Sequence, residues 1–562
     1  MKLELLPDEI FLDIFEYLDG IDIFIALYGL NSRFNYLLYK QYRTFHFRFI
    51  DVSKRTFDWI CQQHLPTITD RVIALRLRNS VETPEQINRF YSYIPSLDRF
   101  IHLRSFSIFG RHSFELLLRV IKECQQLHEL THLNLSYCSS DQQNTSFQLV
   151  IDGIWSIPKL TNCHLDIESA NKTFEFPTVI SSSLQSLFIF HYKFEANELH
   201  RLSTCTPQLQ NLHIFINSNK LTVNDSYSSC IFLKLTVLSV IFVSSVDDVT
   251  LINFFHSTPN LVDLTVGTWS AITYGHQWEN IIRKNLSKLK AFEISMEESF
   301  YDGNDIEITA KELIDSFRSS FWTIEHQWYV HCYTSDETIY LETVNQNVVF
   351  REAIIPKFWQ STCPDANQQW FYDTATWMYH TFFDNSIPSN IHFSNIDSLH
   401  INLPINEQLY TIVPNLNKLT SVTINSYADM HFSEVQILLD KIVKLNQLTI
   451  RHSDQLPITM LFCKLSNLSV NRINLHTSNH YLTNEECLVL SQSVLCHRVK
   501  ILSIPVSDDE GVTHLINNLS NLQTLIIQYQ NDNFIEQLKS HLSSSHVIAQ
   551  DSRGNASVSL WI

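Results

Sequence analysis

Glycine is the residue in shortest supply in this chain. Only nine glycines occur among 562 residues, about 1.6% where globular proteins average about 7%. Loops that cradle phosphate groups need closely spaced glycines, and neither a GxGxxG nor a GxxxxGK[ST] pattern is present. The sequence therefore excludes the common nucleotide-binding loops.

The usual signatures of catalytic and metal centres are also missing. The chain has no GxSxG or HExxH motif, and its eleven cysteines include no CxxC pair. We therefore expect reduced, mostly buried thiols. The densest metal-like cluster is His326, His331 and Cys332, but strand alternation puts His331 on the opposite face from the other two, so we predict a structural role rather than a zinc site. No catalytic residue, metal or cofactor is predicted.

Long apolar runs and positive charge are scarce as well. The most apolar stretch, VLSVIFVSSV (237–246), stops at ten residues, well short of a membrane span. Glu4, Asp8 and Glu9 interrupt the N-terminal apolar residues, which argues against a signal peptide. The net charge of −18 disfavours nucleic acid and anionic lipid and weakly favours a basic partner. We expect an intracellular protein, cytoplasmic or nuclear.

What the chain does have is a repeat of the form L-x-x-L-x-I. Early copies start at 72, 103, 130, 160, 184, 209, 235, 261 and 289, and later copies start at 396, 419, 445, 465, 499 and 522. The starts from 184 to 289 are 25, 26, 26 and 28 residues apart, whereas the step from 465 to 499 is 34. Self-similarity at such a period indicates a stacked repeat architecture.

Each copy alternates like a short strand with one buried face. Helical spacing appears between the copies, in FELLLRVIKEC (114–124), DDVTLINFFHS (247–257) and FSEVQILLDKIVK (432–444). One strand and one helix per repeat stack into a curved parallel sheet lined by helices. The pattern resembles the leucine-rich repeat family in its longer α/β horseshoe form, and the fifteen copies predict about 15 or more irregular repeats.

The sheet should present its outward-pointing strand positions as a ladder on the concave face. The residue between the last two apolar positions of each copy gives Arg76, Ser107, Asn134, His164, Phe188, His213, Ser239, Thr265, Glu293, His400, Thr423, Thr449 and Ser469. Phe188, Phe190, His213 and Phe215 form an aromatic group in adjacent copies, and His164 and Phe109 occupy similar positions. Aromatic residues on a rigid concave face are typical binding hot spots, so we predict that these six bind a protein partner. The alternative is that a loop or the irregular segment covers them.

The repeat pattern is lost between 294 and 396, where five of the ten tryptophans lie. FWTIEHQWYVHCY (321–333) alternates like a strand, and TIYLETV (338–344) follows it. Two interpretations remain open for this stretch: degenerate repeats with aromatic cores, or an inserted module.

The first forty residues predict a small three-helix unit. Pro7, Asp8 and Glu9 are typical of a helix start, and Asp22 and Asn31 are expected caps of two further helices. Such a short unit buries little surface alone and needs a neighbour.

The order of residues in LPDEIFLDIFEYLDGIDI closely resembles the F-box, which is usually found just ahead of leucine-rich repeats. The resemblance implies that the unit docks on a Skp-type adaptor of a cullin-RING (SCF-type) ubiquitin ligase and that the repeats hold the substrate. It assigns adaptor binding to eight positions: Leu6, Pro7, Glu9, Ile10, Ile14, Phe15, Leu18 and Ile23. Two other interpretations stay open: a repeat scaffold whose N-terminal helices only cap the first repeat, and an enzyme with an unrecognised site within 295–395.

The expected organisation is therefore α/β, with an F-box followed by an irregular horseshoe. We predict an F-box-like unit at 1–45, a linker or cap helix at 46–70, repeats at 71–294, an irregular aromatic-rich segment at 295–395 and repeats at 396–562.

Overall fold

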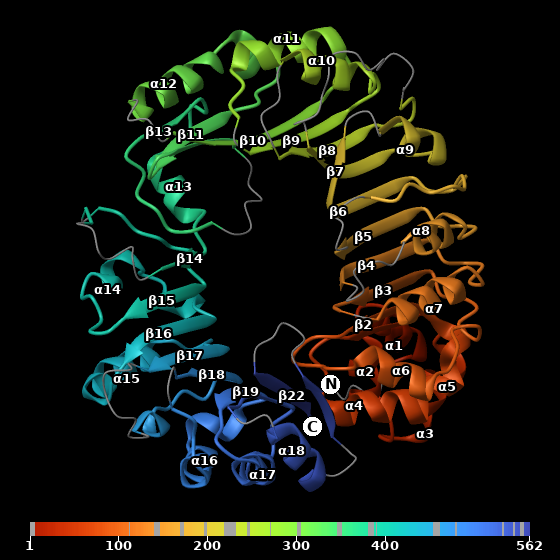
Figure 1. The fold of residues 1–562 in the computed structure, drawn as a ribbon, viewed down its shortest axis with the longest axis vertical. Helices are drawn as coiled ribbons and strands as arrows, with labels where there is room; N and C mark the ends of the chain where they lie inside the picture. The colour runs from red at the N-terminus through yellow and green to blue at the C-terminus, as the bar shows by residue number, and fades with distance from the viewer. Residues whose placement is uncertain are drawn as a thin grey trace.

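The computed structural model of the chain describes residues 6–111, 113–139, 147–168, 174–195, 199–217, 232–243, 248–269, 271–300, 305–344, 351–379, 387–388, 390–452, 461–477, 480–530, 533–542, 546–550 and 556–562. Strands and helices alternate along the chain. The strands lie side by side on the inside of a curved path, and most helices lie outside it (Figure 1). The fold is mixed α/β with large parallel sheets.

The first sheet has thirteen strands, of which the first ten are parallel and in chain order. These ten are β1 (Phe45–Phe49), β2 (Val72–Arg78), β3 (Ser105–Phe109), β4 (His132–Ser139), β5 (Asn162–Glu168), β6 (Ser186–Glu195), β7 (Asn211–Asn217), β8 (Val237–Phe242), β9 (Asp263–Trp269) and β10 (Ala291–Ser299). Three antiparallel strands complete the sheet in the order β12 (Thr338–Thr343), β11 (Val330–Ser335) and β13 (Trp359–Ser361).

The helices between these strands cover the outer side of the sheet (Figure 1). They are α4 (Lys54–Trp59), α5 (Leu65–Ile68), α6 (Gln86–Tyr93), α7 (Phe114–Cys124), α8 (Gln148–Trp155), α9 (Leu199–Cys205), α10 (Asp248–His256), α11 (Gly275–Asn285) and α12 (Ile306–Ser316). The predicted helix at 114–124 is confirmed as α7. Its N-cap Ser113 accepts a 3.2 Å hydrogen bond from the Leu116 amide, and its Leu117, Val120 and Ile121 side chains are buried at helical spacing.

The second sheet has nine strands, of which the first seven are parallel. They are β14 (Trp377–Met378), β15 (Ser398–Asn402), β16 (Ser421–Tyr427), β17 (Gln447–His452), β18 (Arg472–His476), β19 (Ile501–Pro505) and β20 (Thr524–Gln528). The antiparallel β22 (Ser557–Trp561) and β21 (Val547–Gln550) end the sheet. The accompanying helices are α13 (Gln368–Asp373), α14 (Leu409–Ile412), α15 (Phe432–Lys441), α16 (Asn484–Ser491), α17 (Asp509–Asn518) and α18 (Phe534–His541).

The leucine spacing of each copy fixes which strand face is buried. In the copy at 235–240, Leu235, Leu238 and Val240 are buried, and Ser239 between the last two points to the other face. Because strand side chains alternate and neighbouring strands are in register, each copy adds one more layer to the core of its sheet.

Three short helices precede the first strand: α1 (Asp8–Phe15), α2 (Gly20–Leu27) and α3 (Ser32–Tyr36), followed by a π-helical turn at Leu37–Gln41. The predicted cap Asn31 is confirmed, since its Oδ1 accepts a 3.0 Å hydrogen bond from the Phe34 amide. The prediction that Asp22 caps the second helix was wrong. Asp19 holds that place and accepts from the Ile21 amide at 2.9 Å, because α2 begins two residues earlier than Asp22.

The strand sheet begins earlier than expected. The segment 46–70, predicted to be a linker or cap helix, contains most of β1, which pairs in parallel with β2. In FHFRF, Phe45, Phe47 and Phe49 are buried while His46 and Arg48 point away. The strand was missed because phenylalanines replace the leucines of the repeat pattern.

The segment between the two parallel runs consists of neither regular repeats nor the single long strand expected at 321–333. Phe321–Glu325 forms a π-helical turn, and the strand β11 starts only at Val330. β11 and β12 form an antiparallel hairpin joined by Asp336 and Glu337, where Asp336 adopts a φ of 50°. The alternating pattern at 330–343 therefore belongs to a hairpin at the end of the first sheet. The interpretation of these residues as a degenerate parallel repeat was wrong, because both strands run antiparallel.

The copy assigned to 465–470 is also shifted. β18 lies at Arg472–His476, where Leu448 pairs with Ile473, and Ile473 pairs with Leu502. Residues 465–470 precede the strand, so Asn474 rather than Ser469 takes the concave position next to Thr449. LSNLSV and VNRINL both fit the same short pattern, and sequence alone could not rank them.

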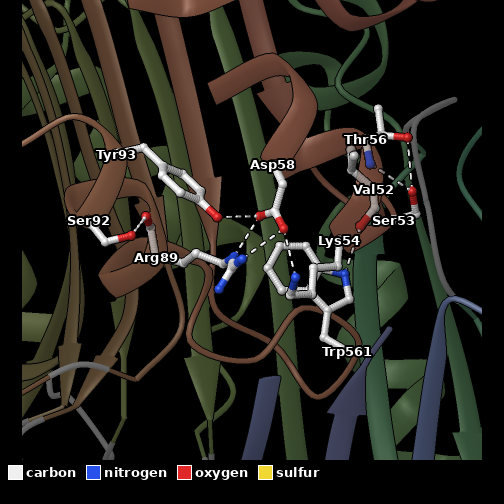
Figure 2. Close-up of polar contacts among 9 residues, drawn as sticks. All are labelled: Val52, Ser53, Lys54, Thr56, Asp58, Arg89, Ser92, Tyr93 and Trp561. Carbon is white, nitrogen blue, oxygen red and sulfur yellow. Dashed lines mark hydrogen bonds and ion pairs between the residues drawn. The ribbon is translucent and has the colours of Figure 1, made fainter. Parts of the chain in front are cut away.

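The two sheets have separate hydrophobic cores, but the end of the chain reaches the core of the beginning. Trp561 of β22 is fully buried in the N-terminal core, 5.2 Å from the Phe57 ring, and its Nε1 donates a 3.0 Å hydrogen bond to the Val52 carbonyl (Figure 2). Glu82 forms a 2.8 Å ion pair with Arg472, and the Glu82 backbone carbonyl accepts a 2.6 Å hydrogen bond from the Thr524 hydroxyl. We call these contacts the terminal junction.

Candidate protein-binding surfaces

The concave ladder forms in register across the first sheet. Arg76 pairs with Ser107, and the pairing continues through Asn134, His164, Phe188, His213, Ser239, Thr265 and Glu293. These side chains therefore line one continuous inner surface, in the order predicted from the repeat.

Five of the six predicted inner-face residues form one aromatic group. The Phe188 ring stacks between two imidazoles, with centroids 4.1 Å from both His164 and His213 and nearly parallel planes. Phe190 lies edge-on to Phe215 at 4.8 Å. We call this group of His164, Phe188, Phe190, His213 and Phe215 the aromatic stack. All of its rings are partly exposed except that of Phe215, which is 7% exposed.

The aromatic stack is uncharged near neutral pH. Burial lowers the pKa of His213 to about 4, helped by repulsion from His164, and burial also lowers the pKa of His164. Both rings therefore present flat, neutral faces at pH 7.

Phe109 lies apart from this group. It belongs to β3, and the Arg76 guanidinium covers its ring at 4.2 Å. The structure thus places Phe109 beside a cation rather than in the aromatic stack.

Sequence reasoning missed Trp269. This residue ends β9, is 43% exposed, and packs edge-on against Phe215 at 6.1 Å, which extends the aromatic surface by two strands. It lies beyond the six-residue copy that was used to build the ladder. Continuing the strand alternation by two residues would have found it.

The eight N-terminal positions divide between core and surface. Phe15 and Ile23 are buried, Leu6 is half-buried, and the others are exposed: Pro7, Glu9, Ile10, Ile14 and Leu18. The exposed residues of α1 thus follow one another at helical spacing on the side away from the N-terminal core. The buried two help to hold the helices on the first repeat.

Further exposed apolar residues on these helices were not predicted. Ile25, at 60% exposure, lies on α2 and Leu30, at 62%, follows it; Tyr17 and Tyr36 are also exposed. The Arg33 side chain fastens α3 to the start of α1, donating to Asp8 Oδ1 at 2.7 Å and to the Leu6 carbonyl at 2.5 Å. The three helices therefore present their apolar surface as one unit.

The metal-like cluster does not come together. His326 stacks on Trp328 at 4.1 Å, whereas His331 is fully buried 3.4 Å from Glu342. Arg351 also pairs with Glu342. In the described parts of the chain, no three His, Cys, Asp or Glu side chains are grouped so that they could hold a metal ion.

Nine cysteines lie in the described segments, and all are free thiols. Seven of them are buried, and burial raises the pKa of Cys496 to about 11 and that of Cys332 to about 12. Inert buried thiols of this kind agree with the expected reduced state. No helix within the described ranges is both long enough and apolar enough to cross a membrane.

No protein-family model and no curated protein sequence matches this chain. Among solved structures, the chain is similar to the leucine-rich repeat-containing protein LegL7 from Legionella pneumophila. The likeness covers 72% of this chain and 91% of LegL7, with 12% sequence identity and a TM-score of 0.22.

Proposed function

We propose that this chain is a leucine-rich-repeat protein that acts as the substrate-recognition subunit of an SCF-type ubiquitin ligase. In this proposal the N-terminal helices dock on a Skp-type adaptor, the inner face of the repeats binds a protein substrate, and other subunits carry out catalysis. The observation that carries it is the combination of an F-box-like sequence with an exposed apolar surface on the same helices.

The exposed surface supports adaptor binding. Ile10 and Ile14 on α1 and Leu18 just after it are all more than a third exposed, although each would stabilise the protein if buried. A chain that needed α1 only as a cap has no use for a row of exposed aliphatic side chains. Exposed apolar patches of this kind are typical of protein interfaces.

The test is co-precipitation of a Skp-type adaptor by the wild type and by Ile10→Asp/Ile14→Asp. We expect the wild type to retain the adaptor and the variant to lose at least about tenfold in affinity, because a buried unpaired carboxylate costs more than about 1.4 kcal/mol. The double variant should fold normally, since both side chains are on the surface.

A matched control is Ile308→Asp, which places the same charge on an exposed isoleucine of α12. It should bind adaptor like the wild type. Failure of the wild type to bring down adaptor, under conditions where a known F-box protein does, would sink the ligase proposal.

A second function has a specific observation in its favour. Phe24 of α2 is fully buried and stacks on Phe45 and Phe47 of β1, at 5.6 and 6.4 Å. The N-terminal helices thus cover the open edge of the first repeat, which every stacked-repeat protein must protect. If no adaptor binds, a protein-interaction scaffold with a helical cap is the remaining proposal.

A further inference from the structure

Charge is sorted along the inner face of the first sheet. Strands β7 to β10 and β12 contain no lysine or arginine, and they carry five acidic residues: Asp263, Glu293, Glu297, Glu298 and Glu342. Strand alternation places four of these on the inner face, since Glu298 belongs to the opposite side. One basic residue, Lys193, lies in the neighbouring β6.

Glu297 carries a charge that no cation of the described chain compensates. Glu342 pairs with Arg351 and lies near His331, but Glu297 forms no ion pair with any residue of the described chain. Partial burial and repulsion from Glu342 raise the pKa of Glu297. A cation placed beside this carboxylate would favour its charged form and so oppose both effects on the pKa.

Aromatic rings flank the same carboxylate. Glu297 pairs in register with Trp269 on one side and with Tyr340 on the other. Paired residues on adjacent strands are about 5 Å apart, so the two side chains stand next to Glu297. Trp269 in turn contacts Phe215 of the aromatic stack at 6.1 Å.

We infer that this surface binds a basic, arginine-containing segment of the protein partner, with an arginine against Trp269 and Glu297. A guanidinium can stack on an indole face and also pair with a carboxylate, and both groups are available here within one strand spacing. The net charge of −18 draws such a segment toward the protein. This inference rests on the proposed role of the inner face in partner binding.

The arginines at the other end of the same sheet, on β1 and β2, indicate which way round the bound segment lies. Arg48 and Arg76 are paired in register on β1 and β2, and Arg78 follows two residues after Arg76. A basic segment is repelled there and attracted at β9 to β12. The cationic part of the partner therefore lies over β9, β10 and β12, with its apolar part over the aromatic stack.

The experiment uses the full chain and labelled twelve-residue peptides, measured by fluorescence anisotropy. The probes are (Gly-Arg-Ser)4, its lysine counterpart and its glutamate counterpart. We expect the arginine peptide to bind several times more tightly than the lysine peptide, and the glutamate peptide not to bind. Glu293→Gln/Glu297→Gln should weaken arginine-peptide binding at least tenfold, and Trp269→Ala should remove the preference for arginine over lysine.

The matched control is Glu307→Gln/Glu312→Gln on the exposed outer helix α12, which removes the same charge from the opposite side. It should leave binding within about twofold of the wild type, an effect of less than about 0.5 kcal/mol. Equal losses in the control and inner-face variants would mean general attraction to an acidic protein and would overturn the inference. Absence of arginine-peptide binding, or equal binding of the glutamate peptide, would overturn it too.

Adaptor co-precipitation on the same preparations separates this inference from the proposed function. A chain that holds adaptor but not the arginine peptide refutes the basic-partner assignment alone. If the chain binds the peptide through Trp269 and Glu297 but does not bind the adaptor, the basic-partner inference stands and the protein is a scaffold rather than a ligase subunit.

Discussion

His64 joins the N-terminal helices to the first repeat through its ring. It is 1% exposed and lies within 4.4 to 4.6 Å of the rings of Phe24, Tyr28 and Trp59, and Tyr39 forms a hydrogen bond with its Nδ1. Burial lowers the pKa of His64 to about 4. The surrounding aromatic rings thus favour the neutral imidazole over the charged imidazolium.

This residue predicts an acid-sensitive stability. The folded-state pKa of about 4 lies below the ordinary value of 6.5, so protons bind more readily to the unfolded chain. The stabilising effect is complete above pH 6.5 and is lost as the pH falls toward 4, where we expect a cost of about 3 kcal/mol. Melting temperatures from pH 7.5 to 4.5 should fall more steeply for the wild type than for His64→Phe. Parallel curves for the two proteins would contradict the prediction.

At the scale of elements, the antiparallel strands β21 and β22 connect the last parallel strand to the N-terminal core. β22 pairs with the last parallel strand, β20, and its Trp561 leaves that sheet's own core for the N-terminal one. Nearby, Asp58 of α4 binds Lys54 at 2.7 Å, Arg89 at 2.5 Å and Tyr93 at 3.0 Å, which ties α4 to α6 (Figure 2). Trp561 therefore packs on a helix that is already held in place.

Two substitutions separate the packing of Trp561 from its hydrogen bond. Trp561→Ala should destabilise the protein by about 3–5 kcal/mol, because it leaves a cavity beside Phe57. Trp561→Phe keeps most of the packing and leaves the Val52 carbonyl unpaired, so we expect a loss of about 1–2 kcal/mol. Urea denaturation measures both. An alanine variant as stable as the phenylalanine variant would show that the ring contributes little.

The sequence predicted most of the elements that repeat and failed at those that do not. Most strand positions, most of the concave ladder and helices α7, α10 and α15 follow from local spacing alone, whereas β1 was missed and β18 was placed too early. The β11–β12 hairpin and the terminal junction depend on contacts between segments far apart in the chain, which no local period encodes. The aromatic stack was predictable because one strand alternation places all its members, whereas the importance of Glu297 depends on Trp269, Tyr340 and Glu342 from neighbouring strands.

At the scale of the whole molecule, the two sheets form one curved body that returns to its starting point (Figure 1). At the terminal junction, contacts of Trp561, Arg472 and Thr524 join the second sheet to the first. At the other side, Arg351 links the sheets: it pairs with Glu342 of the first sheet and lies over the rings of Tyr333 and Phe371, at 5.2 and 5.0 Å. Each half is thus held to the other at two separate places.

The terminal junction should be separable from the repeats themselves. In Glu82→Ala/Trp561→Ala the ion pair with Arg472 and the indole contact are both lost, while every parallel strand pairing remains. We expect a larger radius of gyration by small-angle X-ray scattering, with an unchanged far-ultraviolet circular dichroism spectrum. An unchanged radius of gyration would mean that the remaining contacts, such as Thr524 to Glu82, suffice to hold the ends together.

Closure also changes how such a protein comes apart. In an open stack of repeats the terminal units have one neighbour each and fray first, since stability is a sum of units and nearest-neighbour interfaces. Here the first repeat and β22 are neighbours of one another, so neither is a free end. Amide hydrogens of β1 and β22 therefore gain protection from exchange together, and loss of the whole terminal junction gives the stack two ends from which unfolding can begin.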